Sequence, residues 1–100
     1  MRIIAKRTLR LFWEEAPAHA TARTPLEDWH GRVRAASWST PAELKSDFGD
    51  ASILKEGRVV FNIGGNRFRL VVRINYHFQV VYVRFVGTHQ EYDRIDAQTI

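Results

Sequence analysis

The chain has 100 residues, of which 45% are apolar and 26% charged, and it contains no cysteine. A chain of this size is expected to form one domain, residues 1–100, and it cannot carry a disulfide or a cysteine-based metal site. The net charge of +4 and an isoelectric point near 10 favour an anionic partner such as RNA or DNA, although many proteins with a modest positive charge bind no nucleic acid.

The first seven residues contain too short an apolar run for a signal peptide. No stretch approaches the roughly 20 apolar residues of a membrane span. Together with the lack of cysteine, these observations suggest a cytoplasmic protein with no membrane partner.

Residues 2–5 are apolar and largely β-branched, and they predict a first strand. Residues 8–16 predict an amphipathic helix, because apolar side chains recur there at helical spacing. Pro17 should end this helix, since proline has no amide hydrogen to donate, and residues 18–23 should form a loop. The expected buried stripe of the helix is Leu9, Phe12, Trp13 and Ala16.

Two Thr-Pro pairs predict the next two helix starts. Residues 24–27 and 40–43 each place Thr at the cap, Pro at the first helical position and Glu three residues after Thr, which fits a capping box. Residues 49–57 should then form a polar loop that carries Lys55. The expected buried side chains are Leu26, Trp29, Val33 and Ala36 in the longer helix, and Leu44 and Phe48 in the shorter one.

The stretch from Val59 to Tyr92 predicts an antiparallel meander. Three runs rich in Val, Ile, Phe and Tyr are separated by turns at residues 64–66 and 76–78. A third capping-box pattern at Thr88 predicts a short terminal helix from His89 to about Ile95, and the tail at residues 96–100 has no pattern.

Alternation along the three strands predicts one nearly apolar sheet face and one basic face. The apolar face should be covered by the N-terminal helices, which gives an α+β fold whose basic face is open. The residues expected on the apolar face are Val59, Phe61, Ile63, Phe68, Leu70, Val72, Ile74, Val81, Val83 and Phe85. The arginines expected on the basic face are Arg67, Arg69, Arg73 and Arg84, with Val86 among the other residues of that face.

This arginine row is the first candidate for function. Arginines side by side repel one another unless an anion is present, and a phosphodiester matches their forked donors. The alternative is a solvated face whose arginines pair with nearby Asp and Glu. Phosphate binding is favoured over this alternative, because the strands carry no acidic residue between Arg58 and Val86.

His89 and Tyr92 lie three residues apart where the last strand ends, so both could reach the rim of the basic face. Histidine can transfer a proton near neutral pH, and tyrosine can donate a hydrogen bond or stack on a base. Position alone supports the structural alternative equally well, in which His89 is an exposed helix residue and Tyr92 packs into the core.

The remaining candidate residues are better explained by structural roles than by functional ones. His19, His30 and His77 lack metal-ligand spacing, and no Ser/His/Asp order or carboxylate pair stands out. Residues 64–65 are better explained as a glycine turn than as a phosphate loop, because no helix follows. The three tryptophans, Trp13, Trp29 and Trp38, fit packing better than base stacking.

The segments FNIGGNRFRLVV and VYVRFVGTHQEYD, within a likeness that extends back through the N-terminal helices, resemble the HigB-type toxins of the RelE-like superfamily. The resemblance implies a compact microbial ribonuclease fold, cleavage of mRNA on the translating ribosome, and inhibition by a HigA-type antitoxin with a helix-turn-helix domain.

By position, Arg69 matches the strand arginine that contacts the scissile phosphate in such toxins. His89 and Tyr92 match places where relatives carry catalytic residues after the last strand. Lys55 matches a basic loop only loosely, because this loop has one lysine and not a cluster.

We therefore expect a cofactor-free, metal-independent endoribonuclease in which the ribose 2′-hydroxyl attacks the adjacent phosphorus. Arg69, His89 and Tyr92 are the expected catalytic residues. The expected RNA-binding residues are Lys55, Arg67, Arg73 and Arg84. The alternative function is a non-catalytic module that binds RNA or an acidic partner with the same basic face.

Overall fold

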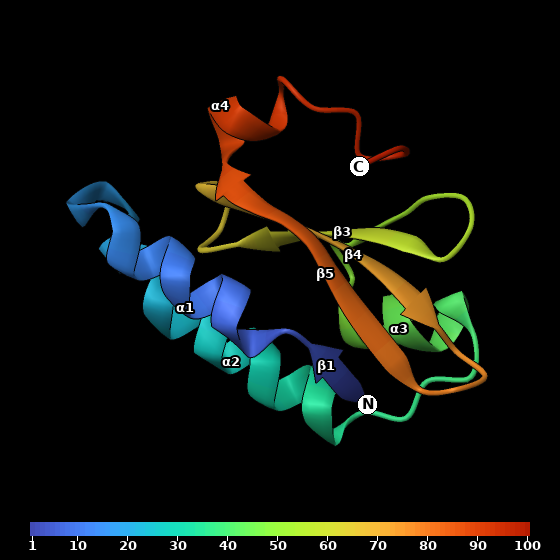
Figure 1. Cartoon of the computed structure of the whole chain (residues 1–100). Helices are drawn as coiled ribbons and strands as arrows, with labels where there is room; N and C mark the ends of the chain where they lie inside the picture. Colours follow the sequence, from blue (N-terminus) through green and yellow to red (C-terminus); the bar gives the residue numbers. More distant parts are fainter.

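A mixed five-stranded sheet with the order β1-β5-β4-β3-β2 forms the centre of the protein (Figure 1). The structure, a computed structural model, describes residues 1–100. The parallel pair is β1 with β5, and the other neighbouring strands are antiparallel. The strands are β1 (Arg2–Ile4), β2 (Ser52–Ile53), β3 (Arg58–Ile63), β4 (Phe68–Asn75) and β5 (Val80–Thr88).

Helices cover one face of this sheet. In Figure 1, α1 and α2 run side by side, while α4 follows β5 at the other end of the molecule. The helices are α1 (Lys6–Glu15), the 3-10 helix η1 (Pro17–Ala22), α2 (Arg23–Ala35), α3 (Pro41–Asp47) and α4 (His89–Tyr92). No helix is long and apolar enough to cross a membrane.

The main core lies between these helices and the apolar sheet face, as predicted. Trp29 from α2 contacts the edge of Phe61 from β3, with ring centroids 5.4 Å apart. Most of the predicted helix stripes are buried in this core together with Phe68, Leu70, Val72 and Ile74 of β4. Trp13, Ala36 and Phe48 are only partly buried against it, and Ala16 lies outside it. Burial of these stripes is the main driving force for the fold.

Two of the three expected threonine caps are correct. The Thr40 hydroxyl accepts a hydrogen bond from the Glu43 amide at 3.3 Å, and Thr88 forms a complete capping box with Glu91. The cap expected at Thr24 is wrong, because η1 replaces the predicted loop and continues directly into α2, which places Thr24 inside the first helical turn. The terminal helix is shorter than expected and ends at Tyr92.

The predicted loop at residues 49–57 contains a further strand, β2, which pairs with β3 through Ser52 and Ile53. Two residues are too few to produce an alternating pattern. The sequence therefore gave no signal for this edge strand.

A β-bulge changes which face the end of β5 presents. Val71 pairs with Phe85 and Val72 pairs with Val83, so that Arg84 has no partner residue across the ladder. The extra residue reverses the alternation beyond it. The predicted faces of Phe85 and Val86 are therefore wrong: Phe85 packs on the outer face, and Val86 packs against the main core.

The outer face is not fully open either. The tail at residues 96–100 crosses it, and Ala97 packs on Val60 and Val71 to form a second small core. Partly buried Leu54, Phe85, Tyr92, Ile95 and Ile100 surround this cluster. The tail thus separates the predicted arginine row into one end near α4 and another near the β4–β5 turn.

Candidate active site

Arg69 is the only charged residue among the buried residues of the chain, with 9% of its surface exposed. Its Nη1 donates to the carbonyl oxygens of Phe68 and Asn66, each at 3.3 Å, and its Nη2 donates to Asn66 Oδ1 at 2.5 Å. None of the four ion pairs of the chain includes Arg69. The guanidinium therefore carries a full positive charge that no carboxylate balances.

The turn between β3 and β4 positions this guanidinium. Gly64 and Gly65 both have positive φ, +63° and +70°, which glycine adopts without steric penalty. The next residue, Asn66, then lies where both its side chain and its carbonyl accept from Arg69. The glycine turn is thus a support for the site and not a phosphate loop.

Tyr92 lies beside Arg69. The guanidinium carbon of Arg69 is 5.9 Å from the centre of the Tyr92 ring, at the outer limit of a cation–π contact. The Thr88 capping box fixes the start of α4 and so the place of Tyr92 at its end. Tyr92 is half-buried and also packs against the second core.

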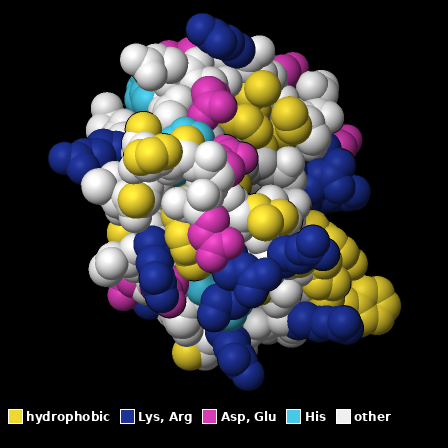
Figure 2. Space-filling model, turned by 60° about the vertical axis from the view of Figure 1, so that its left-hand side comes forward, with side chains coloured by type: hydrophobic (Ala, Val, Ile, Leu, Met, Phe, Trp, Pro, Cys, Tyr) yellow, Lys and Arg dark blue, Asp and Glu magenta, His cyan; other side chains and the backbone are white.

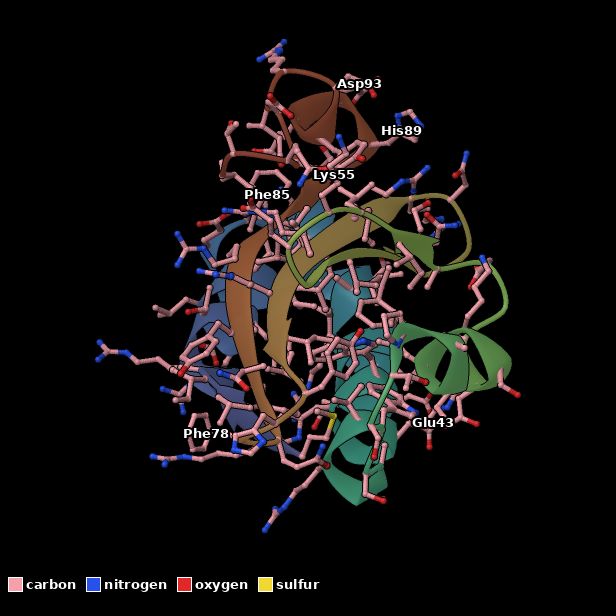
Figure 3. The ribbon with its side chains drawn as sticks, turned by 90° about the vertical axis from the view of Figure 1, so that its right-hand side faces the viewer. Glu43, Lys55, Phe78, Phe85, His89 and Asp93 are labelled. Atoms are coloured by element: carbon pink, nitrogen blue, oxygen red, sulfur yellow. The ribbon has the colours of Figure 1, made fainter.

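His89 is the first residue of α4, and its Nδ1 lies 3.2 Å from Asp93 Oδ2. The side chain is 43% exposed, and its other ring nitrogen makes no hydrogen bond within the chain. Figure 3 shows His89 and Asp93 at the same end of the molecule, both directed outward. A histidine held by a carboxylate through one nitrogen can transfer protons through the other.

A hollow of about 670 Å³ adjoins His89. The wall opposite His89 comes from η1, through Ala18 and Thr21. Its other lining residues are Asn66, Arg67, Phe68, Thr88 and Gln90. Six of its eight lining residues have polar side chains, and one of them is Asn66, the residue that holds Arg69.

Four of the predicted site residues, Arg67, Arg69, His89 and Tyr92, gather at this end of the sheet. The other three lie elsewhere. The main chain of Lys55 exchanges hydrogen bonds with the side chain of Gln98 in the tail, at 3.3 and 3.1 Å. Arg73 and Arg84 line a separate pocket at the far end of the outer face.

Two residues that support the site, Asn66 and Asp93, were not predicted from the sequence. Asn66 directly follows the two turn glycines, three residues before Arg69, and Asp93 is four residues after His89. The second spacing is the signal that could have found Asp93, because residues i and i+4 adjoin on a helix. Asn66 had no such signal, since its role depends on the geometry of the turn.

The other histidines have structural surroundings. His19 stacks on Phe12 at 4.2 Å between ring centroids, and its Nδ1 is 3.2 Å from Glu15. Burial, with additional repulsion from Lys6 and Arg34, lowers the pKa of His30 below its ordinary value of 6.5. No group of three or more His, Cys, Asp or Glu is placed to hold a metal ion.

Positive charge also extends beyond this end of the sheet. Figure 2 shows Lys and Arg side chains gathered on the lower part of one face. A field of this sign attracts polyanions over the whole surface and not only at one point.

Comparison with known proteins agrees with this architecture. The model of the HigB toxin family, the RelE-like toxic component of a toxin–antitoxin system, matches residues 22–95. The chain is 32% identical to the mRNA interferase toxin HigB of Escherichia coli K12, over 97% of this chain and 92% of that protein. It is 27% identical to the mRNA interferase HigB of Escherichia coli O6:H1, over 95% of this chain and 91% of that protein.

The small α+β domain and these matches along its length define the class, the RelE-like toxins. Within that class the chain belongs to the HigB toxin family.

Proposed function

We propose that this protein is an endoribonuclease that cleaves mRNA and thereby inhibits translation. The observation that carries the proposal is the buried Arg69 guanidinium without a carboxylate partner. A buried charge that lacks a counterion is costly, and such groups concentrate at functional sites. An RNA phosphate would supply the missing anion, and the names of the relatives as mRNA interferases support this choice.

The proposed reaction begins when the ribose 2′-hydroxyl attacks the adjacent phosphorus. The bond from phosphorus to the 5′-oxygen breaks, and the 5′-oxygen takes up a proton as the 2′-hydroxyl loses one, which leaves a 2′,3′-cyclic phosphate and a 5′-hydroxyl. Attack of water on the cyclic phosphate then gives a 3′-phosphate. Arg69 stabilises the negative charge that develops on the phosphate oxygens. The nucleophile belongs to the substrate, so the proposed chemistry uses neither a metal nor a cofactor.

In this proposal His89 transfers a proton between the enzyme and the reacting 2′- or 5′-oxygen. Asp93 orients the His89 ring through the 3.2 Å contact. Tyr92 orients the nucleotide or stacks on its base, next to the charge of Arg69. The assignment is supported by the hollow beside His89, by the exposed His89 side chain and by the contact of Tyr92 with Arg69.

The basic residues outside this group would hold the RNA backbone. Arg67 lies at the hollow itself, Arg73 and Arg84 line the separate pocket, and Lys55 lies beside the tail at Gln98. A site with so few catalytic groups gains from a partner that fixes the RNA in line for attack. We infer that the translating ribosome is this partner.

We further propose that the protein acts in the cytoplasm under the control of a HigA-type antitoxin with a helix-turn-helix domain. The toxin family implies an antitoxin as partner. The HigA type follows from the HigB relatives and not from any surface of this chain.

Analysis of the cleavage products tests the proposal. Labelled mRNA is added to a translation reaction, and the new ends are identified with and without a 2′-deoxy substitution at the main cut. Cuts with 5′-hydroxyl ends that disappear after the substitution support the mechanism. Cuts that persist without the 2′-hydroxyl contradict it. A folded protein that binds RNA but never cuts would instead be a binding module.

A further inference from the structure

A second pocket of about 620 Å³ lies on the outer face, at the end of the sheet away from α4. The strand register places Ile4, Tyr82, Arg73 and Arg58 in one row across β1, β5, β4 and β3. Three of these four, Tyr82, Arg73 and Arg58, line the pocket, and Arg84 lines it beside them. Figure 3 shows this end of the sheet marked by Phe78, far from His89.

None of the four ion pairs of the chain joins an arginine of this pocket to Asp or Glu. Arg58 and Arg84 both donate to the main-chain oxygen of Ile100, the last residue of the sequence, and Arg73 makes no side-chain hydrogen bond. Arg84 uses only its Nε in this contact, so the guanidinium groups of Arg73 and Arg84 keep donors that match an anion.

The rest of the lining suits a nucleobase. Tyr82 is 40% exposed and offers a ring on which a base can stack. Glu56 and Asn75 also line the pocket and can accept hydrogen bonds from exocyclic amino groups. A nucleotide matches both kinds of group, because its phosphate can meet the arginines while the amino group of its base donates to Glu56 or Asn75.

Tyr76 and Glu56 also line this pocket, and both have structural surroundings. The Tyr76 hydroxyl is buried without a hydrogen-bond partner in the chain, and its ring packs against the main core. Glu56 has φ +57° beside Gly57 at φ +77°, and the Arg58 amide donates to the Lys55 carbonyl at 3.2 Å, so this conformation belongs to the turn between β2 and β3. The case for a ligand therefore rests on the arginines and on Tyr82.

From these observations we propose that this pocket binds one unpaired nucleotide of single-stranded RNA, with its base on Tyr82 and its phosphate at Arg73 and Arg84. Arg73 is four residues from Arg69 on the same strand, which corresponds to about 13 Å. The bound nucleotide is therefore not the one that is cut but one farther along the same strand. The inference rests on the proposed function for the choice of RNA, and the pocket itself is separate from the cleavage site.

The test measures binding of fluorescein-labelled 2′-O-methyl RNA, which lacks the nucleophile and cannot be cleaved by the proposed reaction. A dinucleotide and an octanucleotide are compared by fluorescence anisotropy. Tyr82→Ala should weaken octanucleotide binding roughly five- to a hundredfold through lost stacking, while Tyr82→Phe should stay near the wild type. A dinucleotide cannot span the two sites and occupies only one of them at a time, so Tyr82→Ala should cost the octanucleotide more affinity than the dinucleotide.

Arg73→Ala should weaken octanucleotide binding and reduce the slope of log affinity against log salt by about 0.7, the value for one phosphate contact on a single strand. Phe78→Ala, which removes a 71% exposed aromatic outside the pocket, and Arg34→Ala on α2 are the matched controls and should change little. All variants alter exposed side chains, and equal thermal midpoints would show that they fold.

Unchanged octanucleotide binding in both Tyr82→Ala and Arg73→Ala would overturn the proposal. Equal losses for the dinucleotide and the octanucleotide would also overturn it, because one RNA strand would then not occupy the pocket and the cleavage site together. Loss of antitoxin binding with unchanged RNA binding would show that the pocket serves a protein instead. The proposed nuclease function fails separately, if wild-type protein binds the octanucleotide through Tyr82 yet cuts no mRNA in a translation reaction.

Discussion

Replacement of Arg69 by methionine should cost little stability and most of the activity. Methionine keeps the length of the buried stem but removes the charge. Three hydrogen bonds to neutral oxygens hold the guanidinium. At about 1.5–3 kcal/mol for each bond to a charged group, they contribute about 5–9 kcal/mol, and the desolvation of a buried ion offsets several kcal/mol of this.

The two terms nearly cancel, so Arg69→Met should change the free energy of unfolding by no more than about 2 kcal/mol in either direction. Urea unfolding followed by tryptophan fluorescence measures this change, since three tryptophans are present. Cleavage should fall by about a hundredfold to a thousandfold, the effect of removing one preorganised donor to a developing anion.

A different pattern would refute this reasoning. A loss of about 3–5 kcal/mol is typical when a buried ion pair is broken, and it would show that Arg69 has a structural counterion after all. If such a variant still cut RNA at the wild-type rate, Arg69 would be a structural residue. Arg69→Lys separates charge from geometry, because lysine keeps the charge but cannot form the forked contacts to Asn66.

Further predictions concern a proton transfer, a partly buried histidine and two glycines. His89→Gln should flatten the pH–rate profile of cleavage near neutrality, and an unchanged profile would remove His89 from proton transfer. Because burial lowers the pKa of His30 below 6.5, the unfolded chain takes up its proton first as pH falls. Stability present above pH 6.5 should therefore decrease toward lower pH, and urea titrations should show a weaker decrease in His30→Gln. Gly57→Ala should destabilise the fold by about 3 kcal/mol, because Gly57 has φ +77° and a new methyl group would lie 2.5 Å from a carbonyl oxygen of β4. Gly65→Ala, at φ +70° with open space around it, should cost only about 1 kcal/mol, and equal losses in thermal unfolding would contradict the steric argument.

The parts of the fold that the sequence predicted are those set by local pattern. Strict alternation in β4 identified its buried face, and the caps at Thr40 and Thr88 marked two helix starts. The errors have tertiary causes. The bulge opposite Val71 and Val72 adds one residue without a sequence signal, and the cap at Thr24 was lost because η1 runs directly into α2.

In the candidate site, too, the residues set by local pattern were predicted, and those placed by tertiary contacts were not. Arg69, His89 and Tyr92 were expected together because strand register and helix spacing bring them to one end of the sheet. Arg73 and Arg84 were expected in the same row, but the patternless tail docks between them and Arg69 through Ala97. Nothing local to residues 96–100 indicates that docking, since it depends on the apolar surface that Val60 and Val71 form only after the sheet has assembled.

The central claim is that a buried, unpaired arginine makes this toxin an mRNA-cleaving enzyme. The most direct measurement is the cleavage of end-labelled mRNA by wild type and Arg69→Ala, each with and without translating ribosomes. The account predicts discrete cuts for the wild type with ribosomes, and a loss of about a hundredfold or more in Arg69→Ala at similar RNA affinity. Equal cutting by both proteins, or no cutting by folded wild-type protein under any condition, would contradict it.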